Sequence, residues 1–440
     1  MGREEPWSEC LNSLNNLRAA TDLFFDPEIP KKFLKDLEER VFPGKAGQDF
    51  QPLEVLEFLL YAVKEWPESQ AEALLSRTLL QTAKSALFDA PEGGFFEFDL
   101  QKKLETNARL SRLYLEAYSL CGEPLFREAA SKTLTYLRQV LYDPQWGAFC
   151  NGQAGDVSYY RLPLQDRLKR SSPPVERVFY TGSNAMAVLA LIKAAATLTD
   201  ELYEQMTVRI LQFVKERLLD QNRGVCRCLG EDGTVEAPGF LSDYAWTGLA
   251  FLEAYQYFAH EEYKEFADWL LKQMLQNLWD RNSAGFLNVP REDAAVPSSE
   301  KPPLGNAVAM DLLWRLSYIQ GNSAYRKWMG LSLKSLLPLV QTESRWFAPY
   351  AQLMDMYNKG RVEISLVGKR GDHKTKALIV MLHSLYVPRR VLSFVDPSKM
   401  DFILSRGFQG PYPRFFVCRE GRCIGSATNS LELEQVLSQV

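Results

Sequence analysis

Two short motifs alternate along this 440-residue chain and constrain its fold more than any other feature. The first ends an amphipathic segment with Asp and places Gly before an aromatic residue a few positions later. It occurs at residues 87–95, 141–149 and 278–286, with a weaker copy at 218–224. Asp and Gly end a helical pattern, and the aromatic residues that follow favour a short extended segment.

The second motif begins the next helix. It contains Thr106-Asn107-Ala108, Ser183-Asn184-Ala185 and Gly305-Asn306-Ala307, with Ser242-Asp243-Tyr244-Ala245 as a variant. Successive copies lie 59 to 77 residues apart, a length that suits one helical hairpin and a variable loop. The chain is therefore expected to consist mainly of tandem helical hairpins.

The two helices of each predicted hairpin differ in how much of their surface is apolar. Residues 185–198 are apolar almost all round, which is typical of an inner helix. Residues 202–218 carry a single apolar stripe, which is typical of an outer helix. Six pairs can close into a ring that leaves no apolar end bare, so the sequence predicts a mainly α fold, an (α/α)6 barrel. Inner helices are expected to start near residues 52, 106, 183, 243, 305 and 345, and outer ones near 68, 124, 201, 262 and 323, with 29–41 as a sixth.

Connections are expected to be short within a hairpin and long between hairpins, notably over residues 151–182. The long loops therefore gather at one end of the ring, together with the N-termini of the inner helices. Helix N-termini present unpaired N–H groups and a partial positive charge. We expect a ligand to bind at that end, where it would meet Asn107, Asn184, Asp243 and Asn306 together.

The helical period ends near residue 360, and an alternation of strands and helices follows. This pattern is typical of a small α/β domain. We therefore divide the chain into an N-terminal extension (1–28), the barrel (29–360) and a small C-terminal α/β domain (361–440). Strands are expected at 362–367, 391–395 and 414–418, and helices at 374–385 and 430–440.

Composition excludes several classes of partner. A formal charge of −4 and an isoelectric point near 5.7 provide no basic surface for nucleic acid. The longest strongly apolar run, residues 185–192, ends at Lys193 and is too short to cross a membrane. Seven cysteines without framework spacing favour reduced thiols, and Cys226 and Cys228 have no partners that would complete a metal site. We expect a cytoplasmic protein without metal or cofactor; the sequence leaves its oligomeric state open.

Residues 103–110, 181–184, 239–245, 305–309 and 417–423 carry stretches such as Gly239-Phe240-Leu241-Ser242-Asp243-Tyr244-Ala245. In these stretches and in their order, nearly all of the chain resembles the spermatogenesis-associated protein 20 family. That family has a thioredoxin-like domain followed by a six-hairpin ring, and such rings are similar to six-hairpin glycosidases and N-acylglucosamine 2-epimerases. The resemblance implies a glycosidase-like toroid with a sugar-sized cavity for a small-molecule ligand, and fold alone does not establish an activity.

The chain departs from the family pattern at several positions. About 28 residues precede the first predicted helix, and the chain has no Cys-x-x-Cys, so we expect the thioredoxin-like domain and its thiol chemistry to be absent. Residues 99–104 replace the family's His-Phe-Glu-Lys-Met-Leu, and Ser242 replaces one of two adjacent acids. These losses favour a site with reduced catalytic capacity.

Asp243 is the best candidate for a catalytic carboxyl group. Glycoside hydrolysis needs one protonated and one ionised carboxyl on either side of the scissile bond, and Glu176, Asp156 and Glu97 lie on loops that could supply the second. The other interpretation is that Asp243 and the equivalent asparagines only cap their helices. The candidate substrate-binding residues are Asn107, Asn184, Asn306, Tyr244, Trp246, Arg177, Tyr180 and Trp346.

Two functions remain open from the sequence. One is a carbohydrate-active hydrolase with two acids facing each other across an open cavity. The other is a non-catalytic homologue that binds a glycan, a metabolite or a protein, with a cavity that holds one acid or none, or that side chains plug. Epimerase chemistry is disfavoured because it would use cavity histidines. His260 is expected at the wrong end of the ring, and His373 and His383 in the C-terminal domain.

Overall fold

The computed structural model describes residues 23–41, 52–220, 224–290, 300–419 and 422–439; most of the predicted N-terminal extension lies outside these ranges. The predicted hairpins form, and each of their helices begins within three residues of its expected start. The inner helices are α3 (Leu53–Glu65), α5 (Leu104–Cys121), α9 (Thr181–Leu198), α11 (Leu241–Phe258), α13 (Pro303–Ile319) and α15 (Ser344–Lys359). The outer helices are α2 (Glu28–Val41), α4 (Ala71–Lys84), α6 (Pro124–Tyr136), α10 (Glu201–Phe213), α12 (Glu261–Asn277) and α14 (Ser323–Val340).

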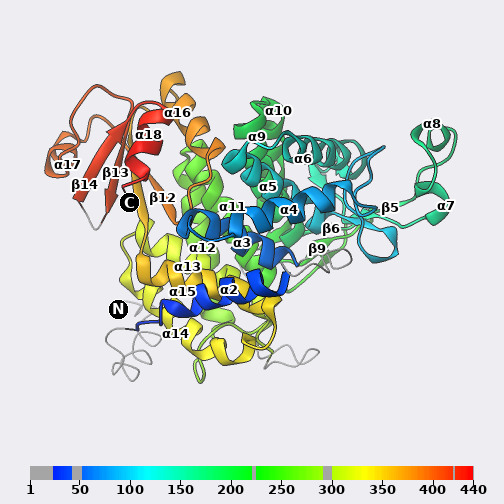
Figure 1. The fold of residues 1–440 in the computed structure, drawn as a ribbon, viewed down its shortest axis with the longest axis horizontal. Coiled ribbons are helices and arrows are strands. Elements are labelled where there is room, and N and C mark those ends of the chain that lie inside the picture. The colour runs from blue at the N-terminus through cyan, green and yellow to red at the C-terminus, as the bar shows by residue number, and fades with distance from the viewer. Residues whose placement is uncertain (1–22, 42–51, 221–223, 291–299, 420–421, 440) are drawn as a thin grey trace.

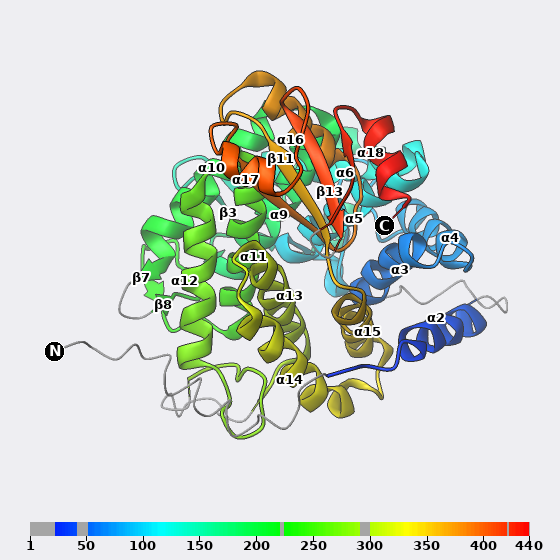
Figure 2. The same cartoon turned by 90° about the vertical axis from the view of Figure 1, so that its left-hand side faces the viewer.

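The six inner helices form a closed ring, in which each packs against the next and α15 packs against α3 (Figure 2). At the closure, the hydroxyl of Tyr61 donates a hydrogen bond to the carboxylate of Asp355 at 2.6 Å, across 294 residues of sequence. The outer helix α2 covers α15, where the rings of Phe33 and Phe347 meet edge to face with centroids 5.0 Å apart. The predicted (α/α)6 barrel is confirmed.

Burial follows the predicted difference between the two kinds of helix. In α9 every residue from 181 to 196 is buried, whereas α10 buries only one side. Within the described residues, α9 is the one helix long and apolar enough to span a membrane, and 83% of it is buried inside the protein. Its apolar surface is accounted for by packing at the centre of the ring.

The two ends of the ring carry different structures (Figure 1). At the end where the inner helices begin, the long connections form short strands and the small helices α7 and α8, which project away from the ring. The short elements of this loop end are η1 (Phe98–Leu100), β1 (Lys102–Lys103), η2 (Leu137–Leu141), β2 (Tyr142–Asp143), β3 (Ala148–Phe149), β4 (Gly152–Gln153), α7 (Val157–Tyr160), α8 (Leu164–Arg167), β5 (Val175–Glu176), β6 (Phe179–Tyr180), η3 (Val214–Leu218), β7 (Leu219–Asp220), β8 (Gly224–Val225), β9 (Cys228–Leu229) and β10 (Val235–Glu236).

The C-terminal residues form a four-stranded sheet at the opposite end, with strand order β12-β11-β13-β14. β11 and β12 are parallel and joined through α16, and the other two pairs are antiparallel. The elements are β11 (Val362–Val367), α16 (His373–Ser384), β12 (Arg390–Val395), α17 (Met400–Ser405), β13 (Arg414–Arg419), β14 (Arg422–Ala427) and α18 (Ser430–Leu437). Neither α17 nor β14 was expected from the sequence; β14 is an edge strand with little buried alternation.

The hydrophobic core is continuous between the ring and this sheet. Ile364 and Leu366 of β11 and Leu382 of α16 belong to the same buried cluster as the inner helices. A second, small cluster that includes Phe408 and Phe416 lies around α17. The sheet is thus packed on one side against the end of the ring, and this contact forms the floor of the cavity described below.

Candidate functional site

The three asparagines of the second motif bind the backbone of the first motif. Asn184 accepts a hydrogen bond from the N–H of Phe149 at 2.8 Å, donates to the carbonyl oxygen of the same residue at 2.9 Å, and donates to Tyr180 at 3.0 Å. Asn107 makes the same three contacts with Phe95 and Lys103, and Asn306 makes them with Phe286 and Pro302.

These contacts explain why the two motifs occur together. Each asparagine is the fourth residue of its inner helix and is fully buried. Its amide satisfies the backbone N–H and carbonyl group of a buried loop residue, which burial would otherwise leave unpaired, and also binds the carbonyl oxygen at the start of its own helix. The expectation that Asn107, Asn184 and Asn306 face a common hollow was wrong, because their amides are directed at the loop backbone.

Asp243 does not occupy the place equivalent to these asparagines. It is the third residue of α11, and the fourth is Tyr244, which is buried and bonds to the backbone of Val225. The carboxylate of Asp243 accepts from the N–H of Phe240 at 2.8 Å and from the N–H of Gly182 at 3.1 Å. It therefore caps its own helix and also binds the first turn of α9, which supports the capping interpretation.

The buried environment of Asp243 raises the pKa of its carboxyl group. Burial raises the pKa of this carboxyl to about 6, against the opposing effect of the two backbone N–H donors. A carboxyl with this pKa could exchange a proton near neutral pH. The side chain is 6% exposed and does not line the cavity on the ring axis.

The loop carboxylates are not brought together with Asp243. Asp156 is exposed and caps α7, where its hydrogen bonds from Ser158 and Tyr159 lower its pKa. Glu176 is exposed and accepts from the side chain of Asn151 at 2.6 Å. Glu97 accepts a hydrogen bond from Thr106. The predicted catalytic pairs are therefore not assembled in this structure.

The remaining loop residues also bind their own surroundings. Arg177 pairs with Asp143 and Glu231, and Tyr180 lies under the guanidinium of Arg227, 5.6 Å from its ring centroid. Trp346 is half-buried at the start of α15 beneath Arg345. None of Arg177, Tyr180 and Trp346 lines the central cavity.

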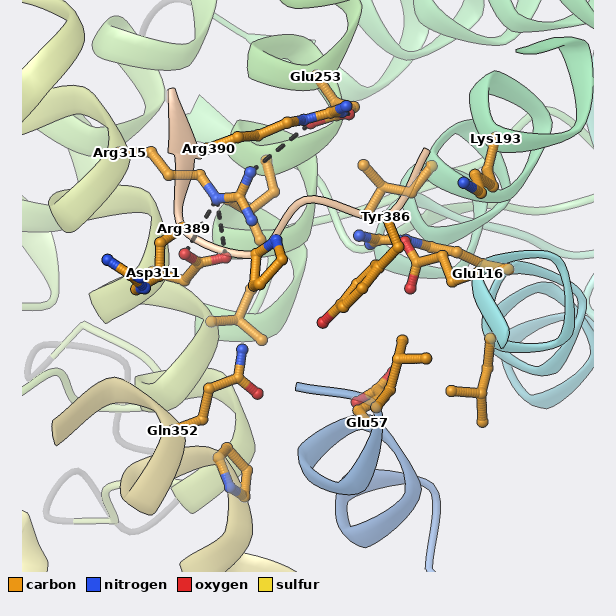
Figure 3. A pocket seen from close by; sticks show the side chains of 18 of the residues that line it. Glu57, Glu116, Lys193, Glu253, Asp311, Arg315, Gln352, Tyr386, Arg389 and Arg390 are labelled. Atoms are coloured by element: carbon orange, nitrogen blue, oxygen red, sulfur yellow. Dashed lines mark hydrogen bonds and ion pairs between the residues drawn. The ribbon is translucent and has the colours of Figure 1, made fainter. Parts of the chain in front are cut away.

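A cavity of about 190 Å³ lies on the axis of the ring (Figure 3). Each of the six inner helices contributes to its wall, and residues 385–390, between α16 and β12, close it at the C-terminal end of these helices. Of the residues predicted from sequence, only Trp246 lines it. The polar and charged lining residues are Glu57, Arg109, Arg112, Glu116, Lys193, Glu253, Asp311, Arg315, Gln352, His383, Tyr386, Arg389 and Arg390.

The cavity wall is built largely from ion pairs. On α5, Arg112 pairs with Glu116 at 2.9 Å, and on α13, Arg315 pairs with Asp311 at 3.0 Å. Arg109 binds Glu57 on the neighbouring helix α3 at 2.9 Å. In a ring of six, α5 and α13 are three helices apart, so the first two pairs lie on facing walls.

The floor of the cavity is held by Lys193. This side chain is buried, and its ammonium group donates to the carbonyl oxygens of His383, Ser384 and Leu385 at 2.9–3.2 Å. These carbonyls end α16, so a cation placed there complements the helix dipole. Burial lowers the pKa of Lys193 to about 7, partly opposed by the charge of Glu116.

The carboxylate of Glu253 lies beside the floor, among several cationic and titratable side chains. It pairs with Arg390, shown by a dashed line in Figure 3, and lies 3.7 Å from Arg315 and 3.5 Å from Nε2 of His383. Burial acts to raise the pKa of Glu253, but the positive charges nearby, chiefly those of Arg390 and Arg315, outweigh it and lower the pKa to about 2. Burial, with help from Arg390, lowers the pKa of His383 to about 3, so its imidazole is neutral. From the sequence, His383 was expected only in the C-terminal domain; the structure also places it in the cavity lining.

Two uncharged polar groups complete the lining. The side chain of Tyr386 points into the space bounded by Glu57, Glu116, Asp311 and Gln352 (Figure 3). The amide of Gln352 makes only a weak 3.8 Å contact with the sulfur of Met356. Within the described ranges, no three His, Cys, Asp or Glu side chains are grouped closely enough to hold a metal ion.

Comparison with known proteins places this ring in a recognised class. No family model matches the chain. Among curated proteins, it is 25% identical to human spermatogenesis-associated protein 20 over 302 residues, and 24% identical to the rat protein over 267 residues. These matches cover 62% and 54% of this chain but only 38% and 32% of the relatives, so the chain spans well under half of their length. The resemblance to the spermatogenesis-associated protein 20 family is confirmed.

Solved structures share the fold at low sequence identity. A GH76 alpha-mannanase from Bacteroides thetaiotaomicron matches with a TM-score of 0.56 and 13% identity, over 76% of this chain and 96% of that enzyme. A D-mannose isomerase matches with a TM-score of 0.56 and 13% identity, over 72% of this chain and 86% of the isomerase. A family 105 glycoside hydrolase from C. acetobutylicum has a TM-score of 0.54 and 10% identity, over 74% and 98%. The ring is thus a six-hairpin, glycosidase-like fold.

Proposed function

We propose that the protein binds a small carbohydrate, about one sugar ring in size, in the cavity on the ring axis. The observation that carries this proposal is the cavity itself, a partly open space of about 190 Å³ whose wall is polar and apolar in roughly equal parts. Drug-sized ligands occupy pockets of roughly 300–1,000 Å³, so this space suits a smaller molecule. The sugar-processing enzymes that share the fold support the same class of ligand.

The chemistry of the wall suits a polyhydroxylated molecule. Each ion pair places guanidinium donors beside carboxylate acceptors, and a sugar hydroxyl can both donate and accept. Trp246 adds an indole ring, which packs well against the apolar face of a sugar. Gln352 and Tyr386 supply further polar groups without a charge.

Binding without hydrolysis is the better supported of the two functions. Glu116 and Asp311 stand on facing walls, as a hydrolase would require, but each is already paired with an arginine on its own helix. The low pKa of Glu253 keeps that carboxyl ionised, and the raised pKa belongs to Asp243, outside the cavity lining. Glu253 is therefore not prepared to act as the general acid. The plug formed by residues 385–390 also fits the expectation for a binding homologue.

Isothermal titration with neutral and acidic monosaccharides and with disaccharides tests this proposal. We expect single-site binding of a monosaccharide, weaker binding of disaccharides, and no release of free sugar from the disaccharides. Gln352→Ala should weaken binding by about tenfold, which corresponds to ~1.4 kcal/mol, without lowering the melting temperature. Asn277→Ala, at an exposed position of α12, is the matched control. If no sugar at millimolar concentration gives a heat of binding or raises the melting temperature of the protein, the proposal fails.

A further inference from the structure

Arg112 has donor groups that the protein itself does not use. Its Nε binds Glu116, but within the described part of the chain neither terminal nitrogen has a hydrogen-bond partner. Its side chain is 34% exposed although it belongs to an inner helix, because it borders the cavity. An arginine fork with two unused terminal nitrogens is suited to bind a carboxylate or phosphate group.

Arg315 faces Arg112 from the opposite wall. Its Nε is bound by Asp311, whereas its Nη1 lies 3.7 Å from Glu253, too far for a hydrogen bond. Burial and the charge of Arg112 both act to lower the pKa of Arg315, although Asp311 and Glu253 outweigh them. The two guanidinium groups are therefore close enough to repel each other, and an anion between them would remove this repulsion.

The hydroxyl of Tyr386 lies in the same region. Burial raises the pKa of Tyr386, with the charge of Glu116 acting in the same direction and the charges of Arg112 and Arg315 acting against it. In the described part of the chain this hydroxyl has no hydrogen-bond partner, and it remains protonated at neutral pH. It is therefore a further donor, directed into the cavity space bounded by Glu57, Glu116, Asp311 and Gln352 (Figure 3).

The charges around the floor do not cancel. Arg112, Arg315 and Arg390 contribute three positive charges, against three negative charges from Glu116, Glu253 and Asp311, while Arg109 and Glu57 balance each other. Lys193, whose pKa is about 7, adds a fourth positive charge when it is protonated. Arg389, which also lines the floor, is balanced by Glu65 at 2.7 Å. With Lys193 protonated, one positive charge is thus left over in a largely buried space, where a bound monoanion would compensate it.

We propose that the carbohydrate bound in the cavity is anionic, a monosaccharide whose carboxylate or phosphate group lies between Arg112 and Arg315. This inference rests on the proposed function and narrows its class of ligand. It predicts a preference among sugars of equal size that differ only in charge.

The test is a titration of the full chain with D-glucose, D-glucuronate and D-glucose 6-phosphate at low ionic strength. We expect one or both of the anionic sugars to bind at least tenfold more tightly than glucose, and the stronger of the two identifies the anionic group. If glucose binds as tightly as both anions, the inference fails and the proposed function stands. If none of the sugars binds, both fail.

Variants separate the role of the free guanidinium from that of the net charge. The double substitution Arg112→Gln with Glu116→Gln removes the pair together, so the charge of the cavity is unchanged and no carboxylate is left unpaired. It should lower the affinity for the anionic sugar at least tenfold more than the affinity for glucose, and Arg112→Gln alone should do the same. Arg127→Gln, at an exposed position of the outer helix α6, is the control. Equal losses for glucose and the anions in the double variant would overturn the inference.

Discussion

The side-chain amide of Asn184 pairs with the backbone of Phe149 as a neighbouring strand would, accepting from its N–H and donating to its carbonyl oxygen. The same relationship joins Asn107 to Phe95 and Asn306 to Phe286. The three inner helices α5, α9 and α13 are thereby each fixed to the short hairpin that precedes them. Removing such a contact should therefore affect stability more than ligand binding.

The asparagine contacts can be tested with Asn184→Ala. This change leaves the buried N–H and carbonyl group of Phe149 without a partner, and we expect it to lower the free energy of unfolding by about 3 kcal/mol. Urea denaturation measures the loss, with the exposed Asn277→Ala as the control, which should change stability by less than ~0.5 kcal/mol. A loss in Asn184→Ala no larger than that of the control would show that these hydrogen bonds contribute little.

Asp243 should make stability depend on pH. Its folded pKa of about 6 lies above the usual value of 3.8, so the folded state binds the proton more tightly than the unfolded state. The stabilising contribution is therefore complete below pH 3.8 and is lost as the pH rises through 6. Relative to Asp243→Asn, the wild-type protein should gain stability between pH 7 and pH 5. If the melting temperatures of the wild type and of Asp243→Asn differ by the same amount at every pH, the raised pKa would be contradicted.

Lys193→Met should loosen the C-terminal sheet. The substitution removes the donor to the three carbonyl oxygens that end α16. Hydrogen exchange measured by mass spectrometry should become faster over α16 and β12, and remain unchanged in α6. Lys132→Met, an exposed position on α6, is the control. Unchanged protection of α16 in Lys193→Met would contradict this anchoring role.

The same lysine predicts a second pH effect with the opposite slope. Its folded pKa of about 7 lies below the usual 10.5, so the unfolded state binds more protons between these values. The contribution of Lys193 to stability is complete above pH 10.5 and is lost as the pH falls through 7. The stability difference between wild type and Lys193→Met should thus grow from pH 7 to pH 9. A constant difference would indicate an ordinary lysine pKa.

Tyr61→Phe tests the closure of the ring. It removes the buried hydrogen bond to Asp355, which keeps its ion pair with Lys359 at 2.9 Å. We expect a loss of roughly 1–3 kcal/mol, typical of a hydrogen bond to a charged group. Tyr118→Phe, at a half-buried position of α5, serves as the comparison. Equal stability of the two variants would mean that the closure does not depend on this bond.

The sequence predicts the helices well because each carries a local signal, either apolar all round or striped. The sequence could not predict where the amide of Asn184 points. A polar residue in the first turn of a helix gives the same pattern whether it caps the helix, binds a neighbouring loop or binds a ligand. Asp243 was placed one residue out of register, because its motif matches that of the asparagines only when Tyr244 is aligned with them.

The cavity residues were missed because most come from the C-terminal halves of the inner helices and from a loop beyond residue 380. A usable signal was present in the sequence. Charged residues such as Arg112, Glu116 and Arg315 interrupt helices that are otherwise built to be buried, and buried charges require partners. Which of them meet on the axis depends on how the ring closes, and no local pattern encodes that closure.

Ring closure also affects how the chain can fold during its synthesis. The hydroxyl of Tyr61 meets Asp355 only after almost 300 further residues have been made. Until then one apolar flank of the earliest inner helix has no neighbour, and contacts between such distant segments form slowly. A nascent chain of this kind exposes an aggregation-prone apolar surface for most of its translation. Its yield in cells should therefore depend on chaperones that cover that surface until α15 emerges from the ribosome.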